Sequence, residues 1–395
     1  MERRVCVAVV GTGPVALGLS LALHRLGVST LLIGEPAAPS DLNTPRHFAL
    51  SLSSIRCLEG LGLWQTLHTQ SAAIETIQVS QPGAPGAVHL RARQAGLACF
   101  GAVIHESLLL RCLANAVAAS GVPVIAGQPV SLQPGSGICK VGRSQGPTVT
   151  VTADLLVGAD GGASPVRKLA GIPLRRGGPQ GTALCAEITT SAPHEQRAFE
   201  RLAREGPIAL LPTAGDRNRW CLVWVRDTTT PQQPGLPIGE LQRAFGWRAG
   251  RIEQHGPVER FAVSPARVPW PCTGKVLLIG DAAHRLHPVA GQGLNLGMRD
   301  LAVLAGMIGA ADARQTITDD LPARFAHQRR ADWRATTRFT ALLPRLFDKR
   351  WPIAPLRGAG LLALDLLPAA KRRFARRASG LLFTASDLER GVPLP

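Results

Sequence analysis

The sequence contains no tyrosine, and only 4% of its 395 residues are aromatic. Proteins that bind single-stranded nucleic acids stack bases on aromatic side chains, and no known nucleic-acid module is visible in this chain. The net charge of +17 therefore does not by itself indicate nucleic-acid binding. We expect no nucleic acid among the partners.

The chain also lacks paired cysteines. Its eight cysteines are scattered, with no C-x-x-C pair and no accompanying histidine cluster, so neither a zinc site nor a disulfide framework is indicated. Hydrophobic residues make up 45% of the chain, enough to bury a sizeable core, which we expect to form two interwoven domains. We predict a cytoplasmic protein without a metal site.

An uninterrupted export signal is missing too. Arg3 and Arg4 precede an apolar run, as in a signal peptide, but Gly11, Gly13 and Pro14 break that run. We therefore interpret the N-terminus as part of the folded domain.

The N-terminal glycines fit a dinucleotide-binding pattern. Gly11, Gly13 and Ala16 form a G-x-G-x-x-A motif between an expected strand at Val5–Val10 and an expected helix at Leu17–Leu26. The glycines permit a tight turn and the close approach of a pyrophosphate, and an acid about twenty residues later can bind a ribose hydroxyl. The predicted nucleotide-binding residues are Gly11, Gly13, Pro14, Val15, Ala16 and Glu35.

A second glycine-bearing turn lies in the string VLLIGDAAHRLHPVAGQGLNLGMRD. We expect a buried strand at Val276–Ile279, Asp281 at its carboxyl end, and a helix that begins near Gly293. The backbone amides at that helix start can face an anion such as a reduced flavin. The alternative is a strand, a loop and a core helix, with Asp281 as a helix cap and both histidines as structural residues.

Shorter strings accompany these two turns. An expected strand at Asp154–Val157 ends in GADGGASPVR, with Asp160 in the turn and Ser164 as the cap of the next helix. Arg46 lies in TPRHFALS, and His105 stands at the start of a predicted amphipathic helix. Taken alone, Arg46 would be interpreted as a surface charge.

Together these strings resemble the flavoprotein aromatic hydroxylases, the family that includes para-hydroxybenzoate hydroxylase and the ubiquinone-biosynthesis hydroxylases. FERLAREGPIALLP at Phe199–Pro212 and the carboxyl-terminal RGAGLLALDLLPAAKRRFARRASGLL are most similar to the UbiH-type branch, which hydroxylates a polyprenyl-methoxyphenol. With ETIQVSQPGAPGAVHL from Glu75, the resemblance covers nearly the whole chain. It implies FAD as cofactor and further FAD-binding residues at Arg46, His105, Asp160, Gly280, Asp281, Pro288, Gly291, Gln292, Gly293, Leu294 and Asn295.

The resemblance also implies separate roles for these residues. Asp281 would hold the ribitol, while Pro288 and the Gly291–Gly293 backbone would border the flavin ring. Asp160 would help to place the pyrophosphate region, and Arg46 would lie against the cofactor and the substrate channel. His105 replaces a more familiar residue beside the adenosine.

The implied reaction is a monooxygenation. NAD(P)H or another donor would reduce the FAD, and O2 would form a flavin C4a-hydroperoxide that attacks an electron-rich phenol. The chain has one dinucleotide fingerprint, which the flavin uses, so NAD(P)H would bind transiently. The protein would hold the ring, stabilise the N1–C2 edge of the flavin and exclude water. Since tyrosine is absent, the catalytic candidates are Pro288, His287 and His284, with a water relay as the alternative base.

The expected fold is α/β, with a Rossmann-like FAD-binding domain interleaved with a β-sheet substrate domain and a C-terminal helical segment, as in para-hydroxybenzoate hydroxylase. Stretches at Ala183–Thr189, Ile208–Leu211 and Trp220–Arg226 predict strands of a sheet that roofs the flavin. The FAD-binding parts are expected at 1–75, 101–180 and 269–335, the substrate-domain parts at 76–100 and 181–268, and the helical segment at 336–395.

The C-terminal segment combines apolar and basic residues. Its apolar stretch, Leu356–Leu367, is too short to span a bilayer. The flanking cations are Arg345, Lys349, Arg350, Arg357, Lys371, Arg372, Arg373, Arg376 and Arg377. This composition is typical of a helix that lies on the anionic inner face of a membrane, and the alternative is a packed terminal helix with solvated arginines.

Three functions stay open on the sequence. The first is hydroxylation of a polyprenyl phenol drawn from the membrane, in ubiquinone biosynthesis and with other proteins of that pathway as partners. The second is the same chemistry on a small soluble aromatic compound. The third is a non-catalytic FAD-fold lipid carrier or scaffold. The intact residues that argue against it are Asp160, Asp281, Pro288, Gly291 and Gly293.

Overall fold

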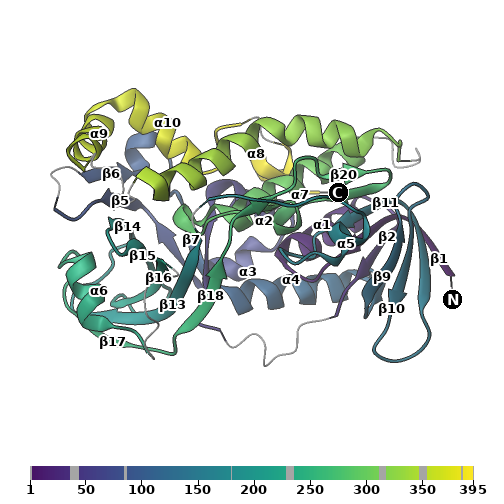
Figure 1. The fold of residues 1–395 in the computed structure, drawn as a ribbon, viewed down its shortest axis with the longest axis horizontal. Helices are drawn as coiled ribbons and strands as arrows, with labels where there is room; N and C mark the ends of the chain where they lie inside the picture. Colours follow the sequence, from purple (N-terminus) through teal and green to yellow (C-terminus); the bar gives the residue numbers. More distant parts are fainter. Residues whose placement is uncertain are drawn as a thin grey trace.

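The computed structural model describes residues 2–35, 44–83, 87–178, 180–227, 235–310, 317–346, 354–383 and 386–394. Two large sheets lie toward opposite ends of the long axis, and a long helix near the C-terminus runs along the top of the view (Figure 1). This arrangement confirms the α/β fold with two interleaved sheet regions.

The first sheet is mostly parallel and contains the N-terminal strand. Its order is β20-β21-β11-β1-β2-β8, and β10 and β9 extend it from β11 as antiparallel strands. Its central strands are apolar because helices cover them. The strands are β1 Glu2–Val10, β2 Thr30–Ile33, β8 Val124–Ile125, β9 Gln128–Gln133, β10 Ile138–Gly142, β11 Val149–Gly158, β20 Cys272–Thr273 and β21 Val276–Leu278.

Three helices pack together over this sheet: α1 Pro14–Arg25, α4 Glu106–Ser120 and α7 Gln292–Ala310. The approach of α1 to α7 is close, since a Cβ on Gly18 would lie 2.7 Å from Cδ1 of Leu301. Both helices contribute fully buried leucines to one core, which fixes the relative position of the two predicted glycine-bearing turns. Shorter helices are α2 Leu52–Gly60, α3 Trp64–His68 and α5 Pro165–Leu169.

The second sheet has the order β17-β13-β16-β15-β14-β5-β6, with β18 also paired to β13. Trp220, Trp224 and Phe245 are fully buried on one face, beneath helix α6 at Ile238–Phe245. The opposite face is free to line a cavity. The strands are β5 Thr76–Ser80, β6 Ala87–Arg91, β13 Gly181–Thr190, β14 Arg197–Ala203, β15 Gly206–Pro212, β16 Arg219–Asp227, β17 Ile252–His255 and β18 Glu259–Val263.

All three strands predicted in this region are confirmed, each within a slightly longer strand of the structure. Strand β14 was not predicted as a strand, although it pairs antiparallel with β15 and parallel with β5. The latter pairing joins the segment around residues 76–91 to the second sheet.

Two small sheets and several short 3-10 helices connect these layers. One sheet contains β3 His47–Ser51, β7 Gly101–His105 and β4 Ser71–Ile74, and the other contains β12 Arg175–Arg176, β19 Ala266–Arg267 and β22 His284–Arg285. The 3-10 helices that bear on the site are η3 Gly280–Ala282, η4 Val289–Gly291 and, near the C-terminus, η5 Leu388–Arg390.

The C-terminal helices are α8 Leu321–Leu346, α9 Ala354–Leu366 and α10 Pro368–Ala378. Helix α8 is continuous through residue 335, so the division expected between residues 335 and 336 falls inside one helix. After α10 the chain returns to the first domain, where Leu388 is 2% exposed and η5 packs on α2. In the described part of the chain, no helix is both long and apolar enough to cross a membrane.

Candidate active site

A cavity of about 960 Å³ lies between the first sheet and the second. Most of the predicted site residues line it, namely Gly11, Gly13, Pro14, Val15, Glu35, Arg46, Asp160, Gly280, Asp281, His287, Pro288, Gly291, Gln292, Gly293, Leu294 and Asn295. Three predicted residues do not line it: Ala16, His105 and His284. The fold thus brings two turns about 280 residues apart in sequence to one cavity.

The first turn suits a pyrophosphate. Gly11 has φ +128°, and a Cβ there would lie 2.4 Å from the carbonyl oxygen of Ala159, so only glycine fits between β1 and β11. Gly13 is the N-cap of α1 and has no side chain to bind the free N–H groups of the first turn. A Cβ added at this position would have no atom within 4 Å, so the space in front of these N–H groups is open. Unpaired amides at a helix start bind anions. Ala16 is fully buried beneath this turn, as expected for a packing residue.

The second turn is held by Asn295 on α7. Its Nδ2 donates to the carbonyl oxygens of Ala49 at 2.8 Å and Gly291 at 2.7 Å. Its Oδ1 accepts from the Ser51 backbone at 2.8 Å and from the Ser54 hydroxyl at 2.7 Å. These four bonds fix the start of α7 against β3 and α2, and the first turn of α7 contains no acidic residue that would repel an anion.

Two carboxylates flank these turns. Asp281 is accessible because it opens into the cavity, while the surrounding protein raises the pKa of its carboxyl by desolvation. Burial likewise raises the pKa of Asp160, whose oxygens accept from the Ser164 hydroxyl at 2.6 Å and the Val166 amide at 2.9 Å. Ser164 caps α5, as predicted, by accepting from the Arg167 amide at 2.9 Å. Asp160 therefore shapes its loop with both oxygens, whereas Asp281 faces the cavity.

The two candidate histidines lie in different environments. His287 lines the cavity, is 2% exposed, and has its pKa lowered by burial to about 4, so its ring is neutral at pH 7. His284 lies on the other side of the segment, with Nε2 2.6 Å from Oδ2 of Asp300. His284 does not line the cavity, so it is poorly placed to act as a catalytic base.

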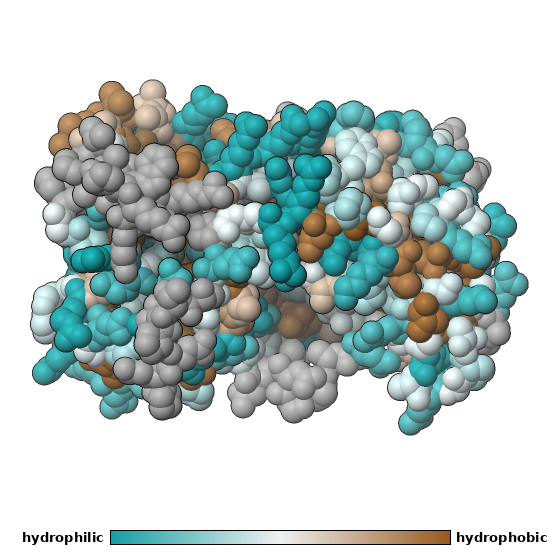
Figure 2. Space-filling view, viewed as in Figure 1, coloured by the Kyte–Doolittle hydropathy of each residue, from teal (hydrophilic) through white to brown (hydrophobic). Residues whose placement is uncertain are grey.

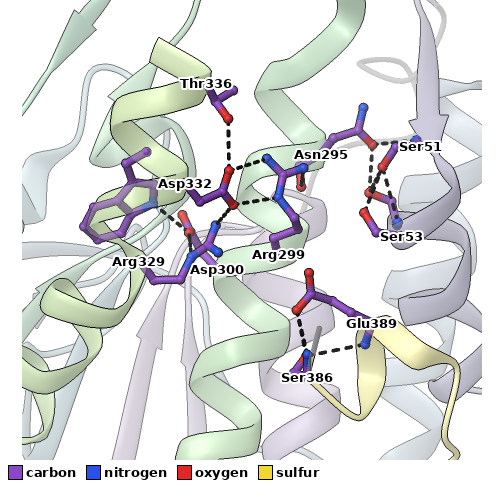
Figure 3. A network of polar contacts seen from close by, with 12 residues as sticks. Ser51, Ser53, Asn295, Arg299, Asp300, Arg329, Asp332, Thr336, Ser386 and Glu389 are labelled. Atoms are coloured by element: carbon purple, nitrogen blue, oxygen red, sulfur yellow. Dashed lines mark hydrogen bonds and ion pairs between the residues drawn. The ribbon is translucent and has the colours of Figure 1, made fainter. Parts of the chain in front are cut away.

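Asp300 belongs to a buried network of charges that joins α7 to α8 (Figure 3). Nε of Arg329 and Nε1 of Trp333 each donate to it at 2.8 Å. Burial raises the pKa of its carboxyl, but His284 and Arg329 outweigh burial, and the net pKa is lower than usual. The network lies behind the helix start and holds α7 in place.

At the cavity entrance, Arg46 lies 3.3 Å from Glu106 and 5.3 Å from the centroid of the Phe261 ring. His105 is instead the N-cap of α4, where its Nδ1 accepts from the amide of Ser107. His47, which the sequence analysis did not single out, lines the cavity and meets the His105 ring edge-on at 4.8 Å.

Glu200 was not among the site residues predicted from the sequence. This residue lies in the middle of β14, paired with Ala209 of β15 and Val79 of β5, and lines the cavity with both. Desolvation raises the pKa of its carboxyl to about 8. Alternation of side chains along AFERLA, residues 198–203, would have placed Ala198 and Glu200 on one face of a strand, but no strand was predicted for these residues.

The donor set therefore fits FAD. A helix start with free amides can take the pyrophosphate, Glu35 lines the same end of the cavity, and the α7 start can face the ring system. Near that start, a Cβ on Gly293 would lie 3.9 Å from Oδ1 of Asp281, so a ligand in the turn would touch both.

Comparison with known proteins agrees with this geometry. A family model described as an FAD binding domain matches residues 4–340. The chain is 34% identical to the ubiquinone hydroxylase UbiL of Rhodospirillum rubrum, covering 98% of this chain and 93% of that one. It is 27% identical to the 3-demethoxyubiquinol 3-hydroxylase of Escherichia coli, covering 95% of this chain and 98% of the relative.

Solved structures share the fold. The p-nitrophenol 4-monooxygenase PnpA from Pseudomonas putida DLL-E4 superimposes with a TM-score of 0.79 at 16% identity, covering 97% of this chain and 99% of that one. The predicted cofactor FAD is confirmed, and the non-catalytic alternative is set aside. The chain belongs to the FAD-binding monooxygenase family that includes the ubiquinone-biosynthesis hydroxylases, and it is an FAD-dependent aromatic hydroxylase.

Proposed function

We propose that the protein hydroxylates the aromatic ring of a polyprenyl phenol in ubiquinone biosynthesis, using FAD, O2 and NAD(P)H. The observation that carries this proposal is the part of the cavity lined by Phe339 and Leu343 of α8 and Phe374 of α10, which we call the apolar extension and which Arg377 borders. A small soluble phenol has no group to fill that extension, whereas an isoprenoid tail would bury apolar surface along it. The names of the two ubiquinone-pathway relatives support the same substrate class.

The FAD-binding residues are assigned from the geometry. The Gly11–Ala16 turn would bind the pyrophosphate with the amides of α1, and Glu35 would bind the adenosine ribose. Asp281 would accept hydrogen bonds from ribitol hydroxyls. The amides of Gln292 to Asn295 would stabilise negative charge at the N1–C2 edge of the ring, because the positive end of the α7 dipole lies there.

When bound and reduced, FAD supplies the oxygen-activating chemistry with O2. The protein residues position the phenol and exclude water. Pro288 would border the ring. Neutral His287 precedes it in the chain and also lines the cavity, and its Nδ1 accepts from the Val289 amide at 3.2 Å. We assign His284 to the buried charge network instead.

The membrane hypothesis is retained for the surface formed by Leu362, Leu366, Leu367, Arg372 and Arg373, which we call the α9–α10 patch. Its leucines are 47%, 68% and 56% exposed, and the two arginines are exposed beside them. Figure 2 shows apolar surface at the upper left, where α9 lies in Figure 1. Apolar residues next to cations match an anionic lipid surface. Lys349 and Arg350 lie outside the described residues, and the side chains of Arg345 and Arg357 are not described.

The substrate class is tested by narrowing the apolar extension. We expect Leu343→Trp to lower kcat/KM for a prenylated phenol by about tenfold or more and to leave kcat/KM for the same phenol without its tail unchanged, because a bulky ring fills only the path of the tail. Leu342→Trp is the control, since Leu342 is the neighbouring residue and is 55% exposed. Wild-type enzyme that shows no preference for the prenylated phenol would favour the small soluble substrate.

The patch is tested on phosphatidylglycerol and phosphatidylcholine vesicles at low salt. We expect Arg372→Glu/Arg373→Glu to weaken sedimentation with the anionic vesicles alone, by about 2 kcal/mol or more for two reversed charges. Arg111→Glu/Arg143→Glu is the charge-matched control, because both arginines are exposed and lie outside the patch. Equal loss in both variants would mean that net charge, rather than the patch, governs binding.

A further inference from the structure

The sheet face that roofs the cavity is apolar apart from one carboxyl. Cavity-lining side chains on its central strands are Ile77, Val79, Cys185, Ala198, Ala209, Leu211 and Val223, and Glu200 lies among them. Direct neighbours of Glu200 across the strands are Val79 and Ala209. A carboxyl in apolar surroundings is costly unless a partner compensates for the lost water, so its position calls for an explanation.

The partner within the protein is the turn at the start of α7. The Ala290 backbone N–H donates a hydrogen bond to the Glu200 carboxyl, and Gln292 Nε2 donates at 3.0 Å to the Ala290 carbonyl oxygen. Ala290 is held at φ +60°, a left-handed conformation that alanine rarely adopts. Glu200 therefore reaches across the cavity to the Pro288–Gly291 turn, which borders the proposed position of the flavin ring.

One N–H group does not saturate a carboxyl. Among the described residues, Ala290 is the one hydrogen-bond partner found for Glu200, and an ionised carboxylate offers about four acceptor positions. Glu200 lines the cavity between the sheet and the proposed flavin, so its other acceptor positions are available to a bound ligand. A phenol placed there for oxygenation would bring its hydroxyl within reach of Glu200.

We propose that Glu200 binds the phenolic hydroxyl of the substrate and accepts its proton as the ring is oxygenated. This inference rests on the proposed aromatic substrate but not on the polyprenyl tail. The phenolic O–H bond breaks, the proton forms an O–H bond on Glu200, and the electron pair left on oxygen raises electron density on the ring. A ring carbon then forms its bond to one oxygen atom of O2, and the hydrogen on that carbon leaves as a proton. NAD(P)H, through FAD, provides two electrons, and the second oxygen atom leaves as water.

The pKa values favour Glu200 over His287 as the proton acceptor. A free phenol has a pKa of about 10, so its proton moves uphill by about six pKa units to a group of pKa about 4. Burial places His287 at a pKa of about 4 and raises Glu200 to about 8. Transfer of the proton to Glu200 is therefore uphill by only about two pKa units, a difference that a positioned general base can overcome.

Glu200→Gln separates this role from a structural one, because the amide oxygen can still accept from Ala290 but cannot take a proton. We expect FAD binding to persist and kcat/KM to fall by about 10²–10⁴. In the wild type, kcat/KM should rise with pH through an inflection near 8, and that limb should be absent in the variant. Glu205→Gln is the control, since Glu205 lies in the β14–β15 turn and does not line the cavity.

A binding measurement keeps this inference apart from the polyprenyl proposal. We use 4-nitrophenol as a probe whose absorbance reports ionisation, and titrate it when bound to the FAD-loaded wild type and to Glu200→Gln. Contact between the two ionisable groups must couple their titrations, so the two curves should differ even if no prenylated phenol is a substrate. Identical curves, or a variant that keeps the wild-type rate and pH profile, would overturn the assignment of Glu200.

Discussion

Removal of the Asp332 charge should destabilise the protein without touching the cavity. Asp332 is 2% exposed and accepts from Arg299 Nε at 2.8 Å, from Arg299 Nη2 at 3.1 Å and from Arg329 Nη2 at 2.7 Å (Figure 3). In Asp332→Asn, two buried guanidinium groups would share the charge of Asp300 alone. Loss of one partner from a buried ion pair costs about 3–5 kcal/mol.

The expected change in melting temperature follows from chain length. Unfolding entropy of about 2.1 cal/mol/K per residue gives about 0.8 kcal/mol/K for cooperative unfolding of 395 residues. The predicted loss of about 3–5 kcal/mol then lowers Tm by about 4–6 °C. Differential scanning calorimetry, with and without excess FAD, measures this shift, and the increment that FAD adds should be the same in both proteins.

Dependence on pH gives a second signature. Burial raises the pKa of Asp332, but Arg299 and Arg329 outweigh burial and hold the net pKa well below its usual value. The folded state therefore binds fewer protons than the unfolded chain below about pH 4, and the stabilisation is constant from pH 5 to 8 and lost as pH falls further.

An exposed ion pair provides the control. Glu195 and Arg197 lie 3.3 Å apart with side chains 57% and 34% exposed, so Glu195→Gln should change the free energy of unfolding by less than about 1 kcal/mol. Equal Tm shifts in the two variants, or no shift in Asp332→Asn, would contradict the predicted stabilisation by the buried ion pairs of Asp332.

Three further predictions concern the cavity. Gly11→Ala should lower Tm or prevent folding, because the added Cβ would lie 2.4 Å from the Ala159 carbonyl oxygen, whereas Gly13→Ala should keep the wild-type Tm and lose affinity for FAD. Calorimetry measures Tm and fluorescence titration measures FAD affinity. Equal Tm values in the two variants would contradict the prediction. Asp281→Asn should weaken FAD by about 1–3 kcal/mol in the same titration, and an unchanged Kd would misplace the ribitol. The Tm of Glu200→Gln should rise relative to that of the wild type as pH rises from 5 to 9. In the folded wild type the carboxyl keeps its proton up to about pH 8, so the wild-type protein loses stability as pH rises toward that value. A difference in Tm that does not change with pH would argue against a desolvated carboxyl.

Helices and strands with strong local patterns were predicted well. The helix at α1 begins three residues before the expected Leu17 because Pro14 is favoured at the first helical position. Strands β13, β15 and β16 extend one or two residues beyond the predicted ranges at both ends. Strand β14 was missed because its polar residues, Arg197, Glu200 and Arg201, disguise a strand that is buried by its neighbours on the sheet.

The two histidines show what a local pattern leaves undecided. His284 and His287 are three residues apart and equally suited to proton transfer by residue type. The chain between them passes from β22 to η4, so one ring meets Asp300 in the core and the other faces the cavity. The surroundings of His284 include Trp333 of α8, which is distant in sequence, at 5.9 Å between ring centroids.

Both glycine-bearing turns could be predicted from the sequence alone, since each depends on residues within one strand, turn and helix. The glycines that permit a tight turn and leave the first amides of the helix uncovered can be recognised in the sequence, whatever the position of that strand and helix in the fold. Only the tertiary structure decided that Glu200, from a separate sheet, faces the Ala290 turn and that the end of the chain returns to α2. Those contacts join segments that share no local pattern, because burial of apolar surface brings whole helices and sheets together and thereby selects which side chains meet.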